Sequence, residues 1–349
     1  MKTRYIRSDA DTPNEEGIRQ AGGIIRAGGL VAFPTETVYG LGGDALNKES
    51  SRKIYEAKGR PSDNPLIVHI CRFSDMEKLV ERIPQAAYDL AEAFWPGPLT
   101  MILPKSDAVP YETTGGLDTV AVRFPSHPAA RAFIEAAGGY VAAPSANRSG
   151  RPSPTTAKYV AEDMDGRIDM IIDGGEVGIG LESTIVDLTG EMPMILRPGY
   201  ITQEMLQNVL GEIAADKTML KEAAGARPKA PGMKYRHYAP KGVLTIVEGN
   251  RDAVTQKINE LAAQASAAGE KVGVIATRET VDAYHADCVK NIGPRADEAA
   301  IAHNLYAVLR EFDDEELTVL FSEAFDTAGM GQAIMNRLLK AAGHRVIRV

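Results

Sequence analysis

The stretch K-G-R-P-S-D-N-P-L, residues 58–66, constrains this chain more than any other. Its two prolines fix their own φ angles and disfavour helix in the residues before them, so the stretch is a stiff loop. The polar side chains on this loop are Lys58, Arg60, Ser62 and Asn64. Two cations beside small polar donors suit an anion such as a polyphosphate, although a charged surface turn would explain the same residues.

Composition limits the class of protein. A chain of 349 residues is long enough for about two domains, and 44% hydrophobic with 25% charged residues is typical of globular proteins. The formal net charge of -8 excludes a polycation that coats nucleic acid, so an anion site must be a local basic patch. The sequence contains neither a long apolar run nor the apolar centre of a signal peptide, so we expect no membrane association and a cytoplasmic protein. Cys71 and Cys288 have no metal-ligand spacing, which favours a reduced pair.

Apolar spacing predicts a helix over residues 14–27 and a buried strand over 30–33. Pro34 then begins a second polar loop, P-T-E-T-V-Y-G-L-G-G-D-A, in which Thr37 is one of several hydroxyl residues. We expect its glycines to let the backbone approach a ligand. The signal is weak by itself, because glycines after strands are common in plain turns and G-L-G-G is not a dinucleotide fingerprint.

Two later segments carry further candidates. Residues 119–124 alternate as a strand does, and Arg123 near its end is either an edge charge or a clamp for a carboxylate. A strand over 140–143 leads into a loop rich in donors, with a helix expected near Pro154. The donors are Ser145, Asn147, Arg148, Ser149, Arg151 and Ser153. Such a loop ahead of a helix N-terminus suits an anion, although a simple N-cap would account for Ser153.

Residues 226–241 contain five Lys or Arg, three prolines and no acidic residue, which is typical of a semi-rigid linker. Because it also carries Tyr235, His237 and Tyr238, we expect it to fold back over a ligand rather than to serve as a surface tether. Residues 242–349 then alternate strand and helix patterns, which predicts a Rossmann-like parallel α/β domain. No phosphate-binding fingerprint occurs there, which favours a structural or regulatory domain over a second active site.

Four motifs together carry a resemblance: P-T-E-T-V-Y-G-L, K-G-R-P-x-x-N-P-L, S-A-N-R-S-G and H-Y-A-P. In this order the chain resembles the YrdC-type threonylcarbamoyl-adenylate synthases in their longer, two-domain form. The resemblance implies a YrdC-like α/β catalytic domain with a twisted mixed sheet over residues 1–215. It further implies a basic, proline-rich linker over 216–241 that closes over the active site, and a smaller Rossmann-like domain over 242–349.

The resemblance also implies a reaction in which L-threonine, bicarbonate and ATP become threonylcarbamoyl-AMP and pyrophosphate. A separate threonylcarbamoyl transferase complex would place the group on a tRNA adenosine. No enzyme nucleophile is needed, because a carbamate of threonine can itself displace pyrophosphate. Positioning and charge stabilisation would then provide the catalysis, which agrees with a site rich in cations and hydroxyls.

By similarity, the signature and catalytic residues are Lys58, Arg60, Ser145 and Asn147. The residues expected to bind ATP are Lys58, Arg60, Asn64, Thr119, Ser145, Ser153, Arg197, Tyr235 and Tyr238. Those expected to bind threonine are Thr37, His69, Arg123, Ala143 and Ser183. His69 either accepts the proton of the threonine amine or is a strand histidine satisfied by backbone. We expect Mg²⁺ with the triphosphate, but no carboxylate cluster that would form a separate metal site.

Two other functions use the same residues. An RNA-binding module could place the basic loops on a phosphate backbone, but the acidic total charge argues against RNA as the main ligand, leaving at most a weak RNA contact. A carbamoyltransferase that uses carbamoyl phosphate would normally contain acylphosphatase and zinc-finger modules. Neither the cysteine spacing nor the length of this chain allows them.

Overall fold

The computed structural model describes residues 2–9, 13–216 and 237–349. Contacts between Cα atoms divide these residues into two compact units. The first unit holds the described residues up to Ser149 and those from Ser153 to Asp216. The second unit holds Gly150–Pro152 and the residues from His237 to Val349.

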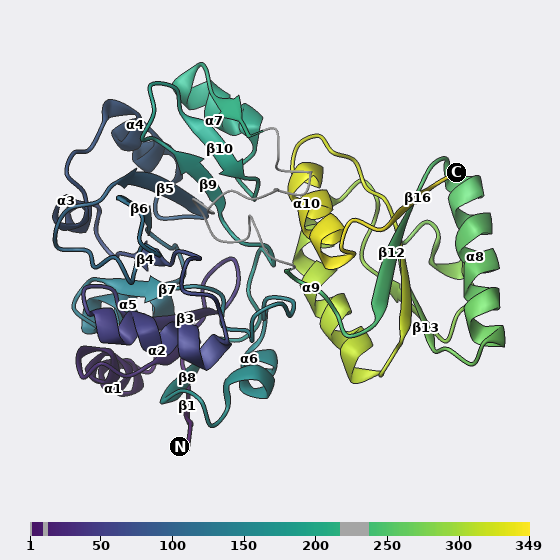
Figure 1. Ribbon diagram of the computed structural model, residues 1–349, viewed down its shortest axis with the longest axis horizontal. Helices are drawn as coiled ribbons and strands as arrows, with labels where there is room; N and C mark the ends of the chain where they lie inside the picture. Colours follow the sequence, from purple (N-terminus) through teal and green to yellow (C-terminus); the bar gives the residue numbers. More distant parts are fainter. Residues whose placement is uncertain (1, 10–12, 217–236) are drawn as a thin grey trace. The chain divides into compact units, whose positions relative to one another are not determined.

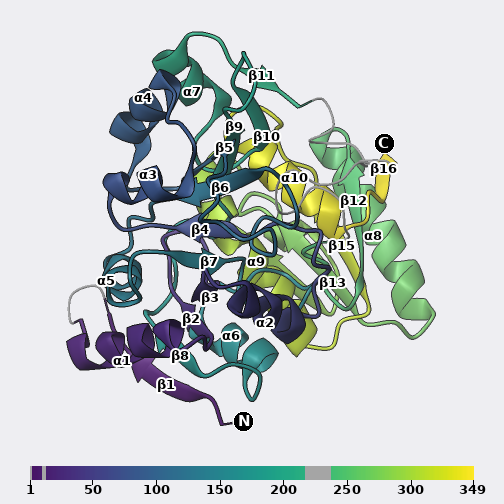
Figure 2. The ribbon, with the colours of Figure 1, turned by 60° about the vertical axis from the view of Figure 1, so that its left-hand side comes forward.

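In its described residues, the first unit has one sheet of eleven strands in the order β1-β8-β2-β3-β7-β4-β6-β5-β9-β10-β11 (Figure 2). The strands are β1 Arg4–Arg7, β2 Val31–Phe33, β3 Gly40–Asp44, β4 Ile67–His69, β5 Leu99–Pro104, β6 Thr119–Arg123, β7 Val141–Ala143, β8 Met170–Asp173, β9 Thr184–Asp187, β10 Met194–Arg197 and β11 Ala214–Ala215. Parallel pairs such as β4–β6 occur beside antiparallel pairs such as β4–β7. The predicted mixed sheet is therefore confirmed.

Helices pack on both faces of this sheet. They are α1 Glu15–Arg26, α2 Lys48–Lys58, α3 Met76–Leu79, α4 Gln85–Phe94, α5 Pro128–Ala136, α6 Ala157–Met164 and α7 Gln203–Leu210. Val31 and Phe33 share an apolar cluster with α1 and α5, whereas Ala32 belongs to the cluster of α2, α4 and α6. Because successive strand residues point to opposite faces, these two sets of helices lie on opposite sides of the sheet.

The second unit contains a parallel sheet in the order β14-β13-β15-β12-β16. Its strands are β12 Val243–Glu248, β13 Val272–Ala276, β14 Cys288–Asn291, β15 Val319–Glu323 and β16 Val346–Arg348. Helix α8, Arg251–Ala267, lies on one face, and α9, Glu298–Asp314, lies with α10, Gly331–Ala341, on the other (Figure 1). The alternating pattern therefore predicted this parallel α/β unit correctly, apart from the short edge strand β14.

The segment that follows Pro34 corrects one expectation. Residues 40–44, predicted as part of a glycine-rich loop, form strand β3, which pairs with β2 and β7. Its glycines serve packing, because a Cβ atom on Gly40 would lie 3.0 Å from the Phe33 ring and one on Gly42 would lie 2.8 Å from Val141. A sequence pattern based on side chains misses a central strand in which three of five residues are glycine.

The predicted helix near Pro154 begins at Ala157 instead, with Thr156 as its N-cap residue. Cys71 and Cys288 are both free thiols, as expected. Among the helices of the described residues, none combines the length and the low polarity needed to cross a lipid bilayer.

Candidate active site

Three loops of the first unit, residues 34–39, 144–149 and 177–183, are joined by main-chain hydrogen bonds. These run from Ala146 N to Tyr39 O (2.8 Å), from Ile179 N to Glu36 O (2.8 Å) and from Gly180 N to Thr37 O (3.0 Å). The P-T-E-T and S-A-N motifs are more than a hundred residues apart in sequence, yet they are neighbours in the fold.

Lys58 is the last residue of α2, which Gly59 ends in the left-handed conformation with φ 62°. The buried Lys58 ammonium donates to Ser145 O at 2.5 Å and to Asn147 O. Ser145 Oγ donates to Asn147 Oδ1 at 2.5 Å. The structure thus brings Lys58, Ser145 and Asn147 together, and carbonyl oxygens fix the position of the cation.

Arg60 lies two residues after Lys58, on the same stiff loop. Its Nε donates to Asn64 O at 3.3 Å and its Nη2 donates to Pro65 O at 3.1 Å. Asn64 is buried, and no hydrogen-bond partner for its Oδ1 occurs among the described residues. A buried amide oxygen without a partner is uncommon in proteins, which makes Asn64 a candidate for contact with a ligand.

The strand register separates two groups of predicted residues. Asn64 precedes β4 and Thr119 begins the parallel strand β6, so both lie at the amino ends of these strands. Ser145 follows the antiparallel strand β7 and belongs to the same edge. His69 and Arg123 end β4 and β6, and the four steps from Thr119 to Arg123 span about 13 Å at 3.3 Å per residue. Three residues predicted for ATP, Asn64, Thr119 and Ser145, therefore lie at one edge, and two of those predicted for threonine, His69 and Arg123, lie at the other.

The register also places three of the predicted threonine-binding residues, His69, Arg123 and Ala143, on one face of the sheet. His69 lies opposite Arg123, and Ala143 lies opposite Ile67, two residues before His69. Cross-strand partners and residues two apart share a face. An apolar cluster lies on the same face and consists of Ile67, Ile102, Ala121, Ile185 and Leu196.

Arg123 forms a buried ion pair with Glu36 from loop 34–39. Its Nη2 lies 2.7 Å from Glu36 Oε1, while Glu36 Oε2 accepts from Ser126 N at 3.2 Å. The Nε of Arg123 is buried and has no hydrogen-bond partner in the part of the chain that is described. The guanidinium is therefore held in place and still has a donor to offer.

His69 is fully buried beside this guanidinium. Burial, and then the charge of Arg123, lower the pKa of its imidazole to about 3. Its Nδ1 lies 3.1 Å from Ile67 O, so the backbone-satisfied interpretation describes the ring as it stands. A neutral imidazole with this pKa is a weak base.

Ser183 lies just before β9, next to the edge that carries Arg123. Its Oγ is 2.7 Å from Thr100 Oγ1, and Thr100 is the β5 partner of Arg123. Arg197 donates to Ser183 O at 2.9 Å and to Ser183 Oγ at 3.1 Å. Gly199 allows this approach, since a Cβ atom there would lie 2.5 Å from Thr184 N. Arg197, predicted for ATP, is therefore placed with a residue predicted for threonine.

The remaining predicted residues are arranged as follows. Ser153 Oγ donates to Glu182 Oε1 at 2.6 Å, next to Ser183. The hydroxyl of Thr37 is buried and 2.9 Å from that of Thr35. Tyr238 belongs to the second unit, where its ring packs on Tyr306. Tyr235 and most of the predicted linker lie outside the described residues, so the closing of the linker over the nucleotide stays a prediction.

Sequence reasoning missed two carboxylates at the site, the partly buried Glu36 and the buried Glu182. Both were visible as acidic residues inside otherwise hydroxyl-rich motifs, P-T-E-T and L-E-S-T. Their function depends on partners that are distant in sequence, Arg123 and Ser153, so no local pattern could assign it.

Comparisons with known proteins cover both units. A family model described as "Telomere recombination" matches residues 23–199. A second model, described as "Threonylcarbamoyl-AMP synthase, C-terminal domain", matches residues 201–343.

Full-length relatives match as well. The chain is 52% identical to a threonylcarbamoyl-AMP synthase of Pyrococcus abyssi, with 95% of this chain and 96% of the relative covered. It is 49% identical to a threonylcarbamoyl-AMP synthase of Bacillus subtilis, over 98% of this chain and 97% of the relative. A crystal structure of P. abyssi Sua5 complexed with L-threonine superposes with a TM-score of 0.93 at 49% identity and covers 100% of both chains.

Proposed function

We infer that this chain, which belongs to the threonylcarbamoyl-AMP synthase family, condenses L-threonine, bicarbonate or CO₂, and ATP into threonylcarbamoyl-AMP and pyrophosphate. The observation that carries this proposal is the buried guanidinium of Arg123, whose Nε has no partner among the described residues. A substrate carboxylate would complete its hydrogen bonding. The relative crystallised with L-threonine supports this choice of substrate.

The threonine subsite consists of Thr37, His69, Arg123, Ala143 and Ser183. Arg123 binds the carboxylate, and Glu36 keeps the guanidinium in position through its ion pair. The hydroxyls of Thr37 and Ser183 recognise the hydroxyl of threonine. Ala143 is small enough to leave room for the substrate on the face that it shares with His69.

The ATP subsite lies at the amino ends of β4 and β6. Lys58 and Arg60 neutralise phosphate charge, and Ser145 with Asn147 orients the ammonium of Lys58. Asn64 and Thr119 lie at the same strand ends. Ser153 and Arg197, which lie with Ser183, and Tyr235 and Tyr238 are the other residues proposed to contact ATP. Side chains on three loops thus replace a glycine-rich phosphate loop, and residues 216–241 would close over the nucleotide.

The reaction needs no protein nucleophile. The threonine amine attacks the carbon of bicarbonate or CO₂; from the ammonium and bicarbonate, this step releases one water and one proton and leaves a carbamate. A carbamate oxygen then attacks the α-phosphorus of ATP, and the bond to the bridging oxygen of pyrophosphate breaks. Because His69 has a pKa of about 3, it orients the amine as a neutral ring and is too weak a base to retain the proton.

Magnesium enters with ATP in this proposal. No group of three or more His, Cys, Asp or Glu that could hold a metal ion occurs in residues 2–9, 13–216 and 237–349. In nucleotide sites Mg²⁺ is commonly held by phosphate oxygens and water. The product supplies a threonylcarbamoyl transferase complex that modifies tRNA in the cytoplasm, with at most a weak RNA contact by this chain.

Mass spectrometry of the nucleotide product tests the proposal. With threonine, bicarbonate and ATP, we expect threonylcarbamoyl-AMP, and carbon-13 bicarbonate should increase the mass of this product but not that of AMP. Omission of threonine should abolish it. Formation of AMP or ADP alone would contradict the proposed reaction. So would an equal release of pyrophosphate when carbamoyl phosphate replaces threonine and bicarbonate.

A further inference from the structure

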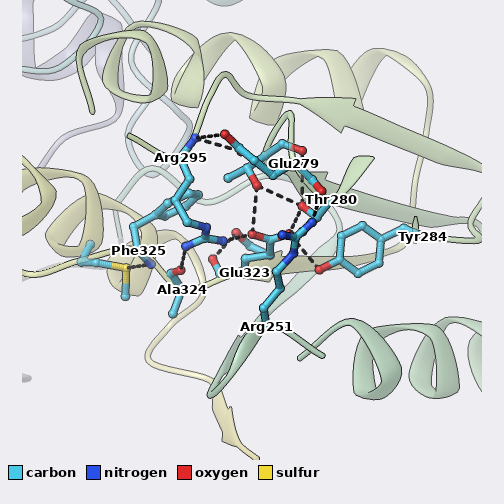
Figure 3. Close-up of polar contacts among 11 residues, drawn as sticks. Arg251, Glu279, Thr280, Tyr284, Arg295, Glu323, Ala324 and Phe325 are labelled. Carbon is cyan, nitrogen blue, oxygen red and sulfur yellow. Dashed lines mark hydrogen bonds and ion pairs between the residues drawn. The ribbon is translucent and has the colours of Figure 1, made fainter. Parts of the chain in front are cut away.

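A polar cluster in the second unit surrounds Glu323, the last residue of β15 (Figure 3). Its carboxylate is buried and accepts hydrogen bonds from the hydroxyls of Thr280 and Tyr284, the latter at 2.8 Å. Arg295 completes the arrangement with an ion pair to the other oxygen. A buried carboxylate with these partners is a fixed anchor for the guanidinium.

Arg295 is positioned from several sides. Its Nη1 donates to Ala324 O at 3.1 Å, and its main-chain N–H donates to the Glu279 carboxylate at 3.0 Å. Its guanidinium lies 5.6 Å from the centre of the Phe325 ring. The side chain nevertheless keeps 43% of its surface exposed, so the guanidinium is both oriented and accessible.

A cavity of about 230 Å³ opens beside this cluster. Arg251, an exposed residue in the first turn of α8, lines it together with Arg295 and Glu323. Val247 and Val254 give it an apolar wall. The main-chain oxygen of Glu279 accepts a hydrogen bond from the guanidinium of Arg251. Glu279 therefore holds both Arg251 and the backbone of Arg295. Two oriented guanidinium groups therefore face one small cavity.

The position of this cavity in the sheet is informative. From β12 the chain passes through α8 to β13 on one side, and from β15 it passes through α10 to β16 on the other. β12 and β15 are neighbours, and α8 and α10 lie on opposite faces of the sheet (Figure 1), so the loops that leave these two strands turn to opposite faces. In open parallel α/β sheets, ligands bind at the carboxyl ends of the strands where the connections diverge. Gly249 and Ala324 directly follow these two strands, and both line the cavity.

We propose that the second unit binds a small oxyanion, a phosphate ester or a carboxylate, between Arg251 and Arg295. The carboxylate of Glu323 is already paired with Arg295 and accepts hydrogen bonds from two hydroxyls. The guanidinium of Arg251 is therefore available for a ligand. A larger neighbouring cavity of about 440 Å³ is lined by Glu298 and Asp326, which disfavour an anion there. The organic part of the ligand would contact Val247 and Val254. This site does not depend on the function proposed for the first unit.

Hydrogen–deuterium exchange of the full-length chain tests the site, because its readout is resolved by peptide. Inorganic phosphate, AMP and L-glutamate are the probes, each at millimolar concentration. We expect slower exchange in peptides from residues 243–256 and 292–300 with at least one probe. Protection by phosphate and AMP identifies a phosphate ester, and protection by glutamate alone identifies a carboxylate. If none of the probes slows exchange there, the proposal is overturned.

Two variants tie the effect to the cavity. Arg251→Ala should weaken the protection about tenfold or more, because a charge-assisted hydrogen bond is lost. Arg278→Ala removes an exposed arginine that does not line the cavity and should leave the protection unchanged. Arg295→Lys retains the charge beside Glu323 but loses the planar fork, and should also weaken it. Equal protection in Arg251→Ala and Arg278→Ala would overturn the proposal.

Discussion

The polar clusters of the two units are held in opposite ways. In the first unit, main-chain oxygens of Ser145 and Asn147 hold the ammonium of Lys58. In the second unit, the carboxylate of Glu323 holds the guanidinium of Arg295, while two hydroxyls hold the carboxylate. Main-chain oxygens on loops therefore position a cation in one cluster, and a buried anion positions it in the other.

This difference determines which of the two clusters can be recognised from sequence. Rigid loops need particular residues at fixed spacings, so the first cluster appears as motifs such as K-G-R-P-S-D-N-P-L. The second cluster takes one or two residues from each of several strand ends. Its members are Arg251, Thr280, Tyr284, Arg295 and Glu323. They form no local pattern, and only the order of the strands shows that they lie together. A domain without a motif can thus still contain an ordered polar cluster.

The largest effect should come from Arg60→Ala in the first cluster. If loop-borne cations stabilise the phosphate charge, the change should lower kcat about 10²–10³-fold, as loss of one transition-state donor does elsewhere. Pyrophosphate release measures it, and a thermal melt shows that the fold is retained. The matched control is Arg52→Ala, an exposed arginine on α2 that pairs with Glu49 and Glu112. Turnover close to that of the unmodified chain would remove Arg60 from the site.

A smaller and more selective effect is expected for Arg123→Lys. Lysine keeps a charge beside Glu36 but cannot form the two parallel hydrogen bonds of a guanidinium with a carboxylate. The KM for threonine should rise about tenfold to a hundredfold, the cost of one charge-assisted hydrogen bond. The KM for ATP should change little. Arg131→Lys, on the exposed side of α5, is the control. Equal increases for both substrates would contradict the separation of subsites along β4 and β6.

The sequence predicted much of this architecture, for reasons visible in particular residues. Alternating apolar segments predicted the parallel sheet of the second unit, and the family motifs predicted that Lys58, Ser145 and Asn147 meet. Strand β3 was missed because three of its five residues are glycine. The Glu36–Arg123 pair was missed because it joins residues 87 positions apart. Contacts between segments that are distant in sequence depend on how the strands pair, and no local pattern can predict them.

In the second cluster, Tyr284→Phe should lower stability without lowering turnover. The change removes a 2.8 Å hydrogen bond to the buried Glu323 carboxylate, worth about 1.5–3 kcal/mol for a charged acceptor. Urea unfolding followed by hydrogen exchange in β15 measures the loss, and pyrophosphate release should stay unchanged. Tyr88→Phe, at an exposed tyrosine of the first unit, is the control. A loss of turnover without a loss of stability would show that the two clusters are not independent.

The smallest effect concerns pH and His69, a buried titratable residue of the first site. In the unfolded chain its ring takes up a proton near pH 6.5, whereas in the folded chain its pKa is lowered to about 3 by burial and by Arg123. Between these values the unfolded state binds more protons than the folded state, so the free energy of unfolding falls as the pH falls below 6.5. Above pH 6.5 the contribution of His69 to stability is fully present. The loss for this one group is about 1.4 kcal/mol per pH unit well inside the window. His69→Asn should reduce that slope in urea titrations from pH 6.5 to 5, with the exposed His285→Asn as the control. An unchanged slope in His69→Asn would mean that the imidazole is already charged in the folded chain, and the weak-base role assigned to it would be wrong.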